Sequence, residues 1–103
     1  MKTISQRFNN KTFWVTDPGK KPRQIMVGGR IHWALASLIA AGDDGCTPID
    51  TPGPRWSHYV WVLRHEHSVC IETINEQHGG PFSGTHARYV LRSVVEPAPE
   101  VAA

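Results

Sequence analysis

Apolar residues recur at helical spacing in two stretches of the chain. In residues 30–41 the apolar stripe consists of Ile31, Ala34, Leu35, Leu38 and Ile39. In residues 55–65 it consists of Trp56, Tyr59, Val60 and Leu63. Side chains three and four positions apart lie on one face of an α-helix, so both stretches predict amphipathic helices. Gly42 follows the first stretch where a left-handed cap is expected, and Pro54 precedes the second as its expected first helical residue.

Shorter runs of β-branched and aromatic residues predict strands. Residues 13–27 predict a β-hairpin, because two apolar runs flank the turn-rich segment 17–22. Residues 69–76 and 86–95 predict two further strands, joined by the glycine-rich loop 78–86. Together with the two helices, these strands predict an α+β domain.

The length of 103 residues and the 40% content of hydrophobic residues predict one domain with a single modest core. We expect this domain over residues 13–95, after a flexible basic N-terminus over 1–12 and before a disordered tail over 96–103. Segment 46–54 holds three prolines and can form about one helical turn. No run approaches the roughly 20 apolar residues of a membrane-spanning helix, and no secretory signal is visible, so we expect a cytoplasmic protein without a membrane partner.

The net charge of +2 is distributed unevenly along the chain. Residues 1–30 hold seven Lys or Arg against one acidic residue, whereas residues 31–103 hold four Arg against eight acidic residues. The N-terminal part therefore carries +6 and the remainder −4. Such an asymmetry favours an N-terminal arm that binds a polyanion. A flexible terminus that is only solvated has the same composition, so both interpretations stay open.

The histidines and cysteines do not form a metal-binding pattern. His65 and His67 project about 200° apart on a helix, so they cannot share one ion. Cys46 and Cys70 are too far apart in the sequence for a paired-cysteine motif. We therefore expect no metal, no cofactor and no catalytic residue, and we expect His32 to lie at the surface. His78 and His86 are expected to close the loop between them by hydrogen bonds.

The order helix, short segment, helix, strand, glycine-rich loop, strand resembles a winged helix-turn-helix domain of the type found in bacterial phages and prophages. The resemblance covers about residues 30–93. Its most telling residues lie in the segments 54–64, 71–73, 78–80 and 86–93, which include Leu63-Arg64, Ile71-Glu72-Thr73 and Arg88-Tyr89-Val90-Leu91. The chain departs from that family in segment 47–53, which supplies about one helical turn where the family has two or more.

The resemblance implies a non-enzymatic regulator that binds double-stranded DNA. Helix 55–65 would lie in the major groove and the loop 78–86 would form a wing beside the backbone. Base contacts are expected from the outward face of the helix, and phosphate contacts from the N-terminal hairpin. The expected DNA-binding residues are Arg55, Ser57, His58, Trp61, His65, Lys20, Lys21, Arg23, Arg30 and Arg88.

Two observations favour a protein partner instead. Residues 31–103, which include nearly all of the part that resembles a winged helix, carry −4, and phosphates would repel such a charge. Trp61 and Val62 are predicted to face outward on helix 55–65, and Trp33 is predicted to reach the surface of the other helix. The alternative is thus a phage-encoded inhibitor that binds a host defence complex through the same surface, as anti-CRISPR proteins do. A homodimer is a third reading.

Overall fold

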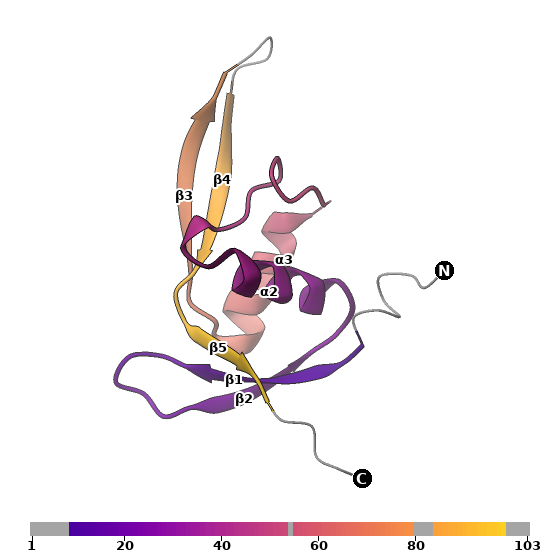
Figure 1. Ribbon diagram of the computed structural model, residues 1–103, viewed down its shortest axis with the longest axis vertical. Helices are drawn as coiled ribbons and strands as arrows, with labels where there is room; N and C mark the ends of the chain where they lie inside the picture. Colours follow the sequence, from indigo (N-terminus) through magenta and orange to yellow (C-terminus); the bar gives the residue numbers. More distant parts are fainter. Residues whose placement is uncertain (1–8, 54, 80–83, 99–103) are drawn as a thin grey trace.

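Two helices and two antiparallel sheets make up the part of the chain that the computed structural model describes, residues 9–53, 55–79 and 84–98, without the side chain of His78 (Figure 1). The elements in chain order are β1 (Lys11–Thr16), β2 (Arg23–Val27), α2 (Gly29–Ala41), the 3-10 turn η1 (Gly42–Asp44), α3 (Trp56–His67), β3 (Ile71–His78), β4 (Gly84–Leu91) and β5 (Val94–Pro97). The α+β class and both helices predicted from the sequence are confirmed. None of the described helices is long and apolar enough to cross a membrane.

The predicted N-terminal hairpin is confirmed, and it belongs to a larger sheet. β1 pairs with β2 in a register that places Phe13 opposite Ile25. β5 pairs with the other edge of β1, so the strand order is β2-β1-β5 and β1 is the central strand. The expected boundaries shift accordingly. Lys11 opens β1 inside the expected flexible N-terminus, and β5 runs through Pro97 into the expected tail.

Helix α2 ends at the predicted glycine. Gly42 has a positive φ of 56°, a conformation that glycine adopts without a Cβ penalty, and its N–H is bonded to the carbonyl of Leu38. The expectation that His32 lies at the surface is wrong. Its Nδ1 lies 2.8 Å from the carbonyl of Asn9 and its ring meets Phe13 edge-on, because the chain entering β1 crosses the first turn of α2.

The segment between the helices forms a single turn, as its prolines predict. The N–H of Thr51 donates to the carbonyl of Thr47 at 2.9 Å. The side chain of Thr47, which is buried, accepts hydrogen bonds from the N–H groups of Ile49 and Asp50. The Thr47 hydroxyl thus provides the acceptor for the first backbone N–H groups of a turn that does not extend into a helix.

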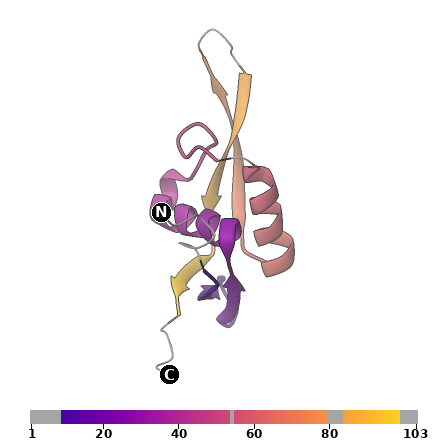
Figure 2. The same ribbon diagram turned by 90° about the vertical axis from the view of Figure 1, so that its right-hand side faces the viewer.

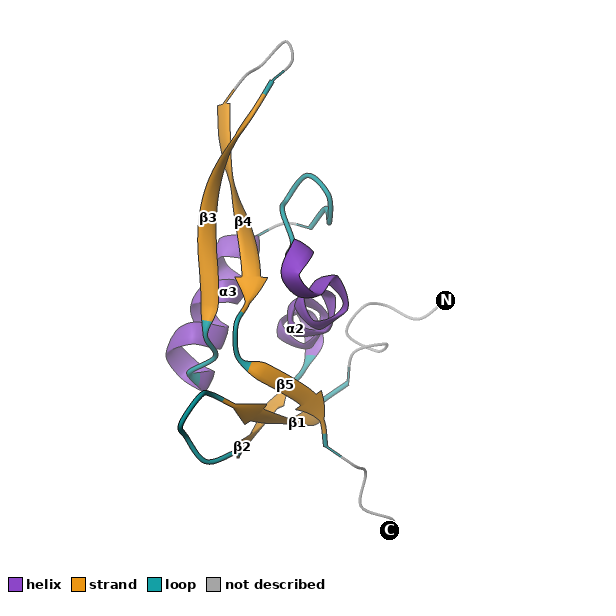
Figure 3. Ribbon diagram, turned by 60° about the vertical axis from the view of Figure 1, so that its left-hand side comes forward, coloured by secondary structure: helices purple, strands orange, loops and turns teal. Residues whose placement is uncertain are grey.

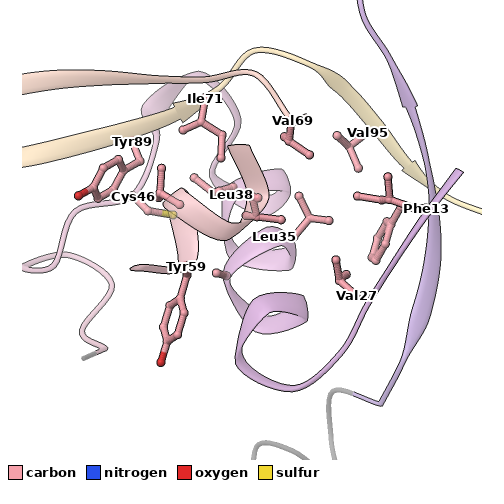
Figure 4. Packing of buried hydrophobic residues seen from close by; sticks show 14 of the residues in the cluster. Phe13, Val27, Leu35, Leu38, Cys46, Tyr59, Val69, Ile71, Tyr89 and Val95 are labelled. Atoms are coloured by element: carbon pink, nitrogen blue, oxygen red, sulfur yellow. The ribbon is translucent and has the colours of Figure 1, made fainter. Parts of the chain in front are cut away.

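Helix α3 buries a wider stripe than the apolar spacing predicts. The four predicted inward residues are buried, and Val62, which we expected to face outward, is also buried at 8% exposure. Pro54, the expected first helical residue, lies outside the described residues. The core, part of which is shown in Figure 4, joins α2 and α3 to both sheets through residues such as Leu35, Leu38 and Val95.

The expected surface position of Trp33 is also wrong. Its indole ring packs 5.2 Å from Trp56 and 6.4 Å from Tyr59, centroid to centroid. Gly53 closes over the same ring, since a Cβ at this glycine would lie 2.6 Å from the indole. Trp33 therefore joins α2 to the segment that enters α3 and is not available as an exposed anchor.

β3 and β4 form a two-stranded hairpin that rises beyond both helices (Figure 2). They pair along eight positions, from Ile71 opposite Leu91 to His78 opposite Gly84. β3 ends at His78, two residues beyond the predicted end, and β4 begins at Gly84, two residues before the predicted start, so both strands reach into the expected loop 78–86. Residues 80–83 lie outside the described part. The predicted strand over 86–95 is in fact two strands, since Arg92 and Ser93 separate β4 from β5.

Candidate functional site

Four side chains share the solvent-facing side of α3. Ser57, His58, Trp61 and His65 are all exposed, as the helical spacing predicts. Trp61 is 51% exposed, and its ring lies 4.8 Å from that of His65 at an interplanar angle of 32°. Ser57, His58 and Trp61 line a shallow, open hollow. This face offers hydroxyl and imidazole groups around one aromatic surface.

Arg55 stands at the N-terminal end of this face. It is the N-cap residue of α3, in the left-handed conformation with φ 66° and ψ 31°, and it is exposed. Its carbonyl accepts the N–H groups of His58 and Tyr59. The backbone of Arg55 therefore starts the helix, and its guanidinium lies at the helix end that favours anions.

The guanidinium of Arg23 is bound within the protein. Its Nη1 donates to Asp17 at 3.0 Å, and its Nη2 donates to the carbonyls of His67 and Ser68 at 3.0 and 2.5 Å. These carbonyls are at the C-terminal end of α3, where a helix lacks internal donors and attracts cations. Arg23 thus fastens the β1–β2 hairpin to the end of α3.

The partner of Arg23 belongs to a buried polar cluster. Asp17 is 7% exposed and accepts a hydrogen bond of 2.5 Å from the hydroxyl of Ser93, which in turn accepts the N–H of Cys70. The hydrogen bond from Ser93 and then that from Arg23 hold the pKa of Asp17 below its usual value, although burial raises it. The cluster joins the β1–β2 turn to the residue before β3, Cys70, and to the residue between β4 and β5, Ser93.

Lys20 and Lys21 are exposed in the β1–β2 turn, beside the C-terminal end of α3 (Figure 3). Arg55 lies at the other end of the helix, whose 12 residues span about 18 Å. The expected basic footprint is therefore divided between the two ends of α3. Glu66, also exposed, lies about 100° around the helix from His65.

Arg30 lies on the first turn of α2 and is exposed. Its guanidinium lies 5.9 Å from the ring of Trp33, which contacts Trp56 and Tyr59 of α3. The chain of contacts places Arg30 on the side of the molecule where α3 begins. Arg30 and Arg55 are therefore the two exposed arginines nearest the start of α3 among the expected DNA-binding residues.

Arg88 is engaged within the protein and is not a free cation. Its Nε donates to Glu76 at 2.7 Å, its Nη1 donates to the carbonyl of Asp44 at 2.7 Å, and its Nη2 lies 3.6 Å from Asp50. The hydrogen bond from Arg88 holds the pKa of the Glu76 carboxyl below its usual value. His86, which we expected to close the loop together with His78, lies 3.0 Å from the same carboxylate, directly across the two strands. The side chain of His78 lies outside the described residues.

The contacts of Arg64 were not predicted from the sequence. Its guanidinium donates to the carbonyl of Ile71 and to the hydroxyl of Thr73, and so ties α3 to β3. Ile71 is only seven positions after Arg64 in the sequence. An arginine near a helix end is long enough to reach a strand that follows the helix directly and runs back along it. That proximity in sequence is the signal that could have indicated the contact.

Among the described residues, no group of three or more His, Cys, Asp or Glu side chains is arranged to hold a metal ion.

Comparison with protein families gives one finding. The model of the winged helix domain family matches residues 24–101, from the second strand of the hairpin past β5. Neither a curated protein nor a solved structure matches the chain.

Proposed function

Because the chain belongs to the winged helix domain family, whose members are in general DNA-binding modules without catalytic activity, we propose that it binds duplex DNA as a transcriptional regulator of phage or prophage type. In this proposal α3 lies in the major groove. The β3–β4 hairpin, hereafter the wing, lies beside the backbone. The exposed hydrogen-bonding face of α3, beginning at Arg55, is the observation that carries the proposal.

The residues assigned to DNA differ from the full set expected from the sequence. We assign base contacts to Arg55, Ser57, His58, Trp61 and His65, which are exposed at or along α3. We assign phosphate contacts to Lys20, Lys21 and Arg30, which are exposed on neighbouring elements. Arg23 and Arg88 leave the set, because their donors are bound within the protein.

Substitution of Arg55 tests the proposal. Wild-type protein is first used to select duplexes from a randomised pool, and the affinity for a selected duplex and for random duplex is then measured by fluorescence anisotropy. Arg55→Ala is expected to weaken binding to the selected duplex by about 1–3 kcal/mol, with a smaller loss on random duplex.

Arg92→Ala is the matched control, because Arg92 is paired with Glu72 away from α3. An equal loss on both duplexes would remove Arg55 from the base-contacting residues. Failure of the wild-type protein to enrich or bind any duplex would refute DNA binding itself.

Capture of a host protein complex is the second candidate, and the 51% exposure of Trp61 favours it. Large aromatic side chains are common anchors of protein interfaces, and contacts of this kind persist at high salt. A complex retained from nuclease-treated host lysate at high salt by the wild-type protein, and lost with Trp61→Ala, would support capture over DNA binding.

A further inference from the structure

The sheet of β1, β2 and β5 has two free edges that differ in chemistry. Among the described residues, β1 is the only strand that pairs with β2 and the only strand that pairs with β5. A free edge exposes backbone N–H and C=O groups, and proteins commonly protect it with a proline or a charge. β5 contains both, Glu96 and Pro97. β2 contains no proline, and its one charged residue, Arg23, is bound to Asp17.

The hydrogen bonds of the sheet determine which backbone groups β2 exposes. The carbonyl of Thr12 accepts an N–H from the residue that follows β5, so the backbone of Thr12 faces the β5 side of β1. Backbone groups of successive residues point to alternate sides of a strand. Phe13 therefore faces β2, and Ile25, which lies opposite Phe13, faces back towards β1. By the same alternation the N–H and C=O groups of Gln24 and Met26 point out of the free edge.

The side chains of these two residues are exposed as well. Met26 is 60% exposed, and it lies with Gln24 on the face of the sheet opposite the core, whereas Ile25 and Val27 are buried. Trp14 of the neighbouring strand lies on the same outward face and is 37% exposed. In Figures 1 and 3, β2 lies on the opposite side of the helices from the wing. A chain that pairs with β2 therefore has access to it without displacing the wing.

The free edge of β2 is complementary to a second copy of itself. When two β2 strands run antiparallel with Ile25 of one copy opposite Ile25 of the other, Gln24 of each copy lies opposite Met26 of the other. Each of these pairs exchanges both N–H···O hydrogen bonds, so every outward backbone group of the two residues is bonded. No other antiparallel register within the strand bounds achieves this.

From this complementarity we infer that two copies of the chain pair through β2 around a two-fold axis. The product is one sheet of six strands, three from each copy. A contact of this kind is isologous, because the same edge serves both copies. The inference goes beyond the proposed function and does not depend on DNA binding. Its partner is a second copy of this chain.

The size and charge of the contact determine the conditions under which it forms. It buries little surface, so the pairing is weak and needs a high protein concentration. Lys20 and Lys21 precede β2 and Arg30 follows it, so antiparallel pairing brings the turn of one copy towards Arg30 of the other. Salt at about 0.5 M screens this repulsion between like charges, and self-association should be measured there.

Amide hydrogen exchange of the wild-type protein tests the contact residue by residue. The amides of Gln24 and Met26 should exchange at least about threefold more slowly at millimolar than at micromolar protein concentration, because pairing protects them. The amide of Val95 is the internal control, since by the same alternation it faces the free edge of β5, and its exchange should not change. Equal slowing at all three amides, or none at Gln24 and Met26, overturns the inference.

Substitutions at the free edge test the same contact by equilibrium sedimentation. Met26→Pro removes an outward N–H without removing a hydrogen bond to β1, and Met26→Lys adds a charge to the edge. Each should raise the dissociation constant of the dimer at least about tenfold. Val94→Lys is the matched control, because Val94 is 57% exposed on the same outward face but belongs to β5, and it should change this constant less than about twofold.

Melting temperatures within a few degrees of the wild type establish that each variant is folded, and Met26→Lys decides alone where Met26→Pro does not fold. A wild-type protein that stays monomeric at millimolar concentration overturns the inference. Equal weakening by Met26→Lys and Val94→Lys overturns it too, because the contact would then not be specific to β2. Weakening confined to the variants of Met26, together with protection of the Gln24 and Met26 amides, supports it.

Discussion

At the scale of single residues, the buried carboxylate of Asp17 organises the region where the β1–β2 turn, the C-terminal end of α3 and the start of β5 meet. It binds Ser93, which precedes β5, and Arg23, which caps α3. A charged group with little exposure is tolerated only where hydrogen bonds replace its hydration. One aspartate in a turn thus holds together three elements that are far apart in the sequence.

Replacement of this carboxylate is expected to destabilise the fold. Asp17→Asn keeps the size of the side chain but presents an amide donor to one of the two groups that now donate to it. The free energy of unfolding should fall by about 2 kcal/mol, the usual range for a buried hydrogen bond to a charged group. Urea denaturation measures this change.

Asp43→Asn serves as the control, because the Asp43 side chain is fully exposed. The free energy of unfolding should then change by less than about 0.5 kcal/mol. Equal effects of the two substitutions would show that the Asp17 cluster adds no stability.

Acid should weaken the same cluster. The pKa of Asp17 is lower in the folded protein than the ordinary value of about 3.9, so the unfolded chain binds more protons between the two values. The stabilisation from Asp17 is fully present above about pH 3.9 and is lost as pH falls through the folded value. Glu76, whose pKa is also lowered, acts in the same direction.

Urea denaturation at pH 6 and pH 3 measures this dependence. The wild-type protein should lose more stability between the two pH values than Asp17→Asn does. A parallel decline in both proteins would assign the acid sensitivity to other carboxylates.

At the scale of elements, the contact between α2 and the segment entering α3 depends on a glycine. A Cβ on Gly53 would lie 2.6 Å from the Trp33 ring, closer than any real contact of this kind. Gly53→Ala must therefore move an indole that is packed between Trp56 and Tyr59. Protein interiors are close-packed, so there is little free space into which the ring can move.

Gly53→Ala is expected to lower the free energy of unfolding by about 1–3 kcal/mol, the range for overpacking. Thermal denaturation followed by tryptophan fluorescence reports both the stability and the displaced indole. Gly79→Ala is the matched control, since no atom lies within 4 Å of its would-be Cβ. A stability unchanged by Gly53→Ala would mean that the segment moves aside without cost.

The elements that the sequence predicts well are those that bury one regular face. The stripes of α2 and α3 and the alternation in β1 and β2 leave a period in the sequence. The partners of Arg23 and Arg88 leave none, because His67, Ser68 and Asp44 bind through backbone carbonyls far along the chain. These carbonyl contacts are the physical reason that the sequence did not predict the intramolecular partners of two expected DNA-binding residues.

At the scale of the whole molecule, the exposed cations that we assign to DNA contacts lie apart from one another. Lys20 and Lys21 are at one end of α3, and Arg30 and Arg55 are towards the other. A duplex lying along α3 would meet a positive group at each end and uncharged or imidazole groups between them. Affinity from phosphates should therefore depend on a few residues.

The double variant Lys20→Gln/Lys21→Gln is expected to weaken binding to selected and random duplexes alike. It should also reduce the magnitude of the slope of log affinity against log salt by about one to two. The reason is that binding releases about one counterion fewer for each phosphate contact that is lost. Lys11→Gln, which removes one positive charge at the other end of the hairpin, is the control and should leave the slope unchanged. An unchanged slope in the double variant would place the turn away from DNA.

The pairing of β1 with β5 also sets an order of events during synthesis. Phe13 pairs with Pro97, and Val15 pairs with Val95, so the central strand of the sheet gains its second partner only after residues 94–97 have left the ribosome. Contacts between residues distant in sequence form slowly. Until the last strand emerges, one edge of β1 has no backbone partner, and a nascent chain stalled before residue 94 should be cleaved readily by proteases.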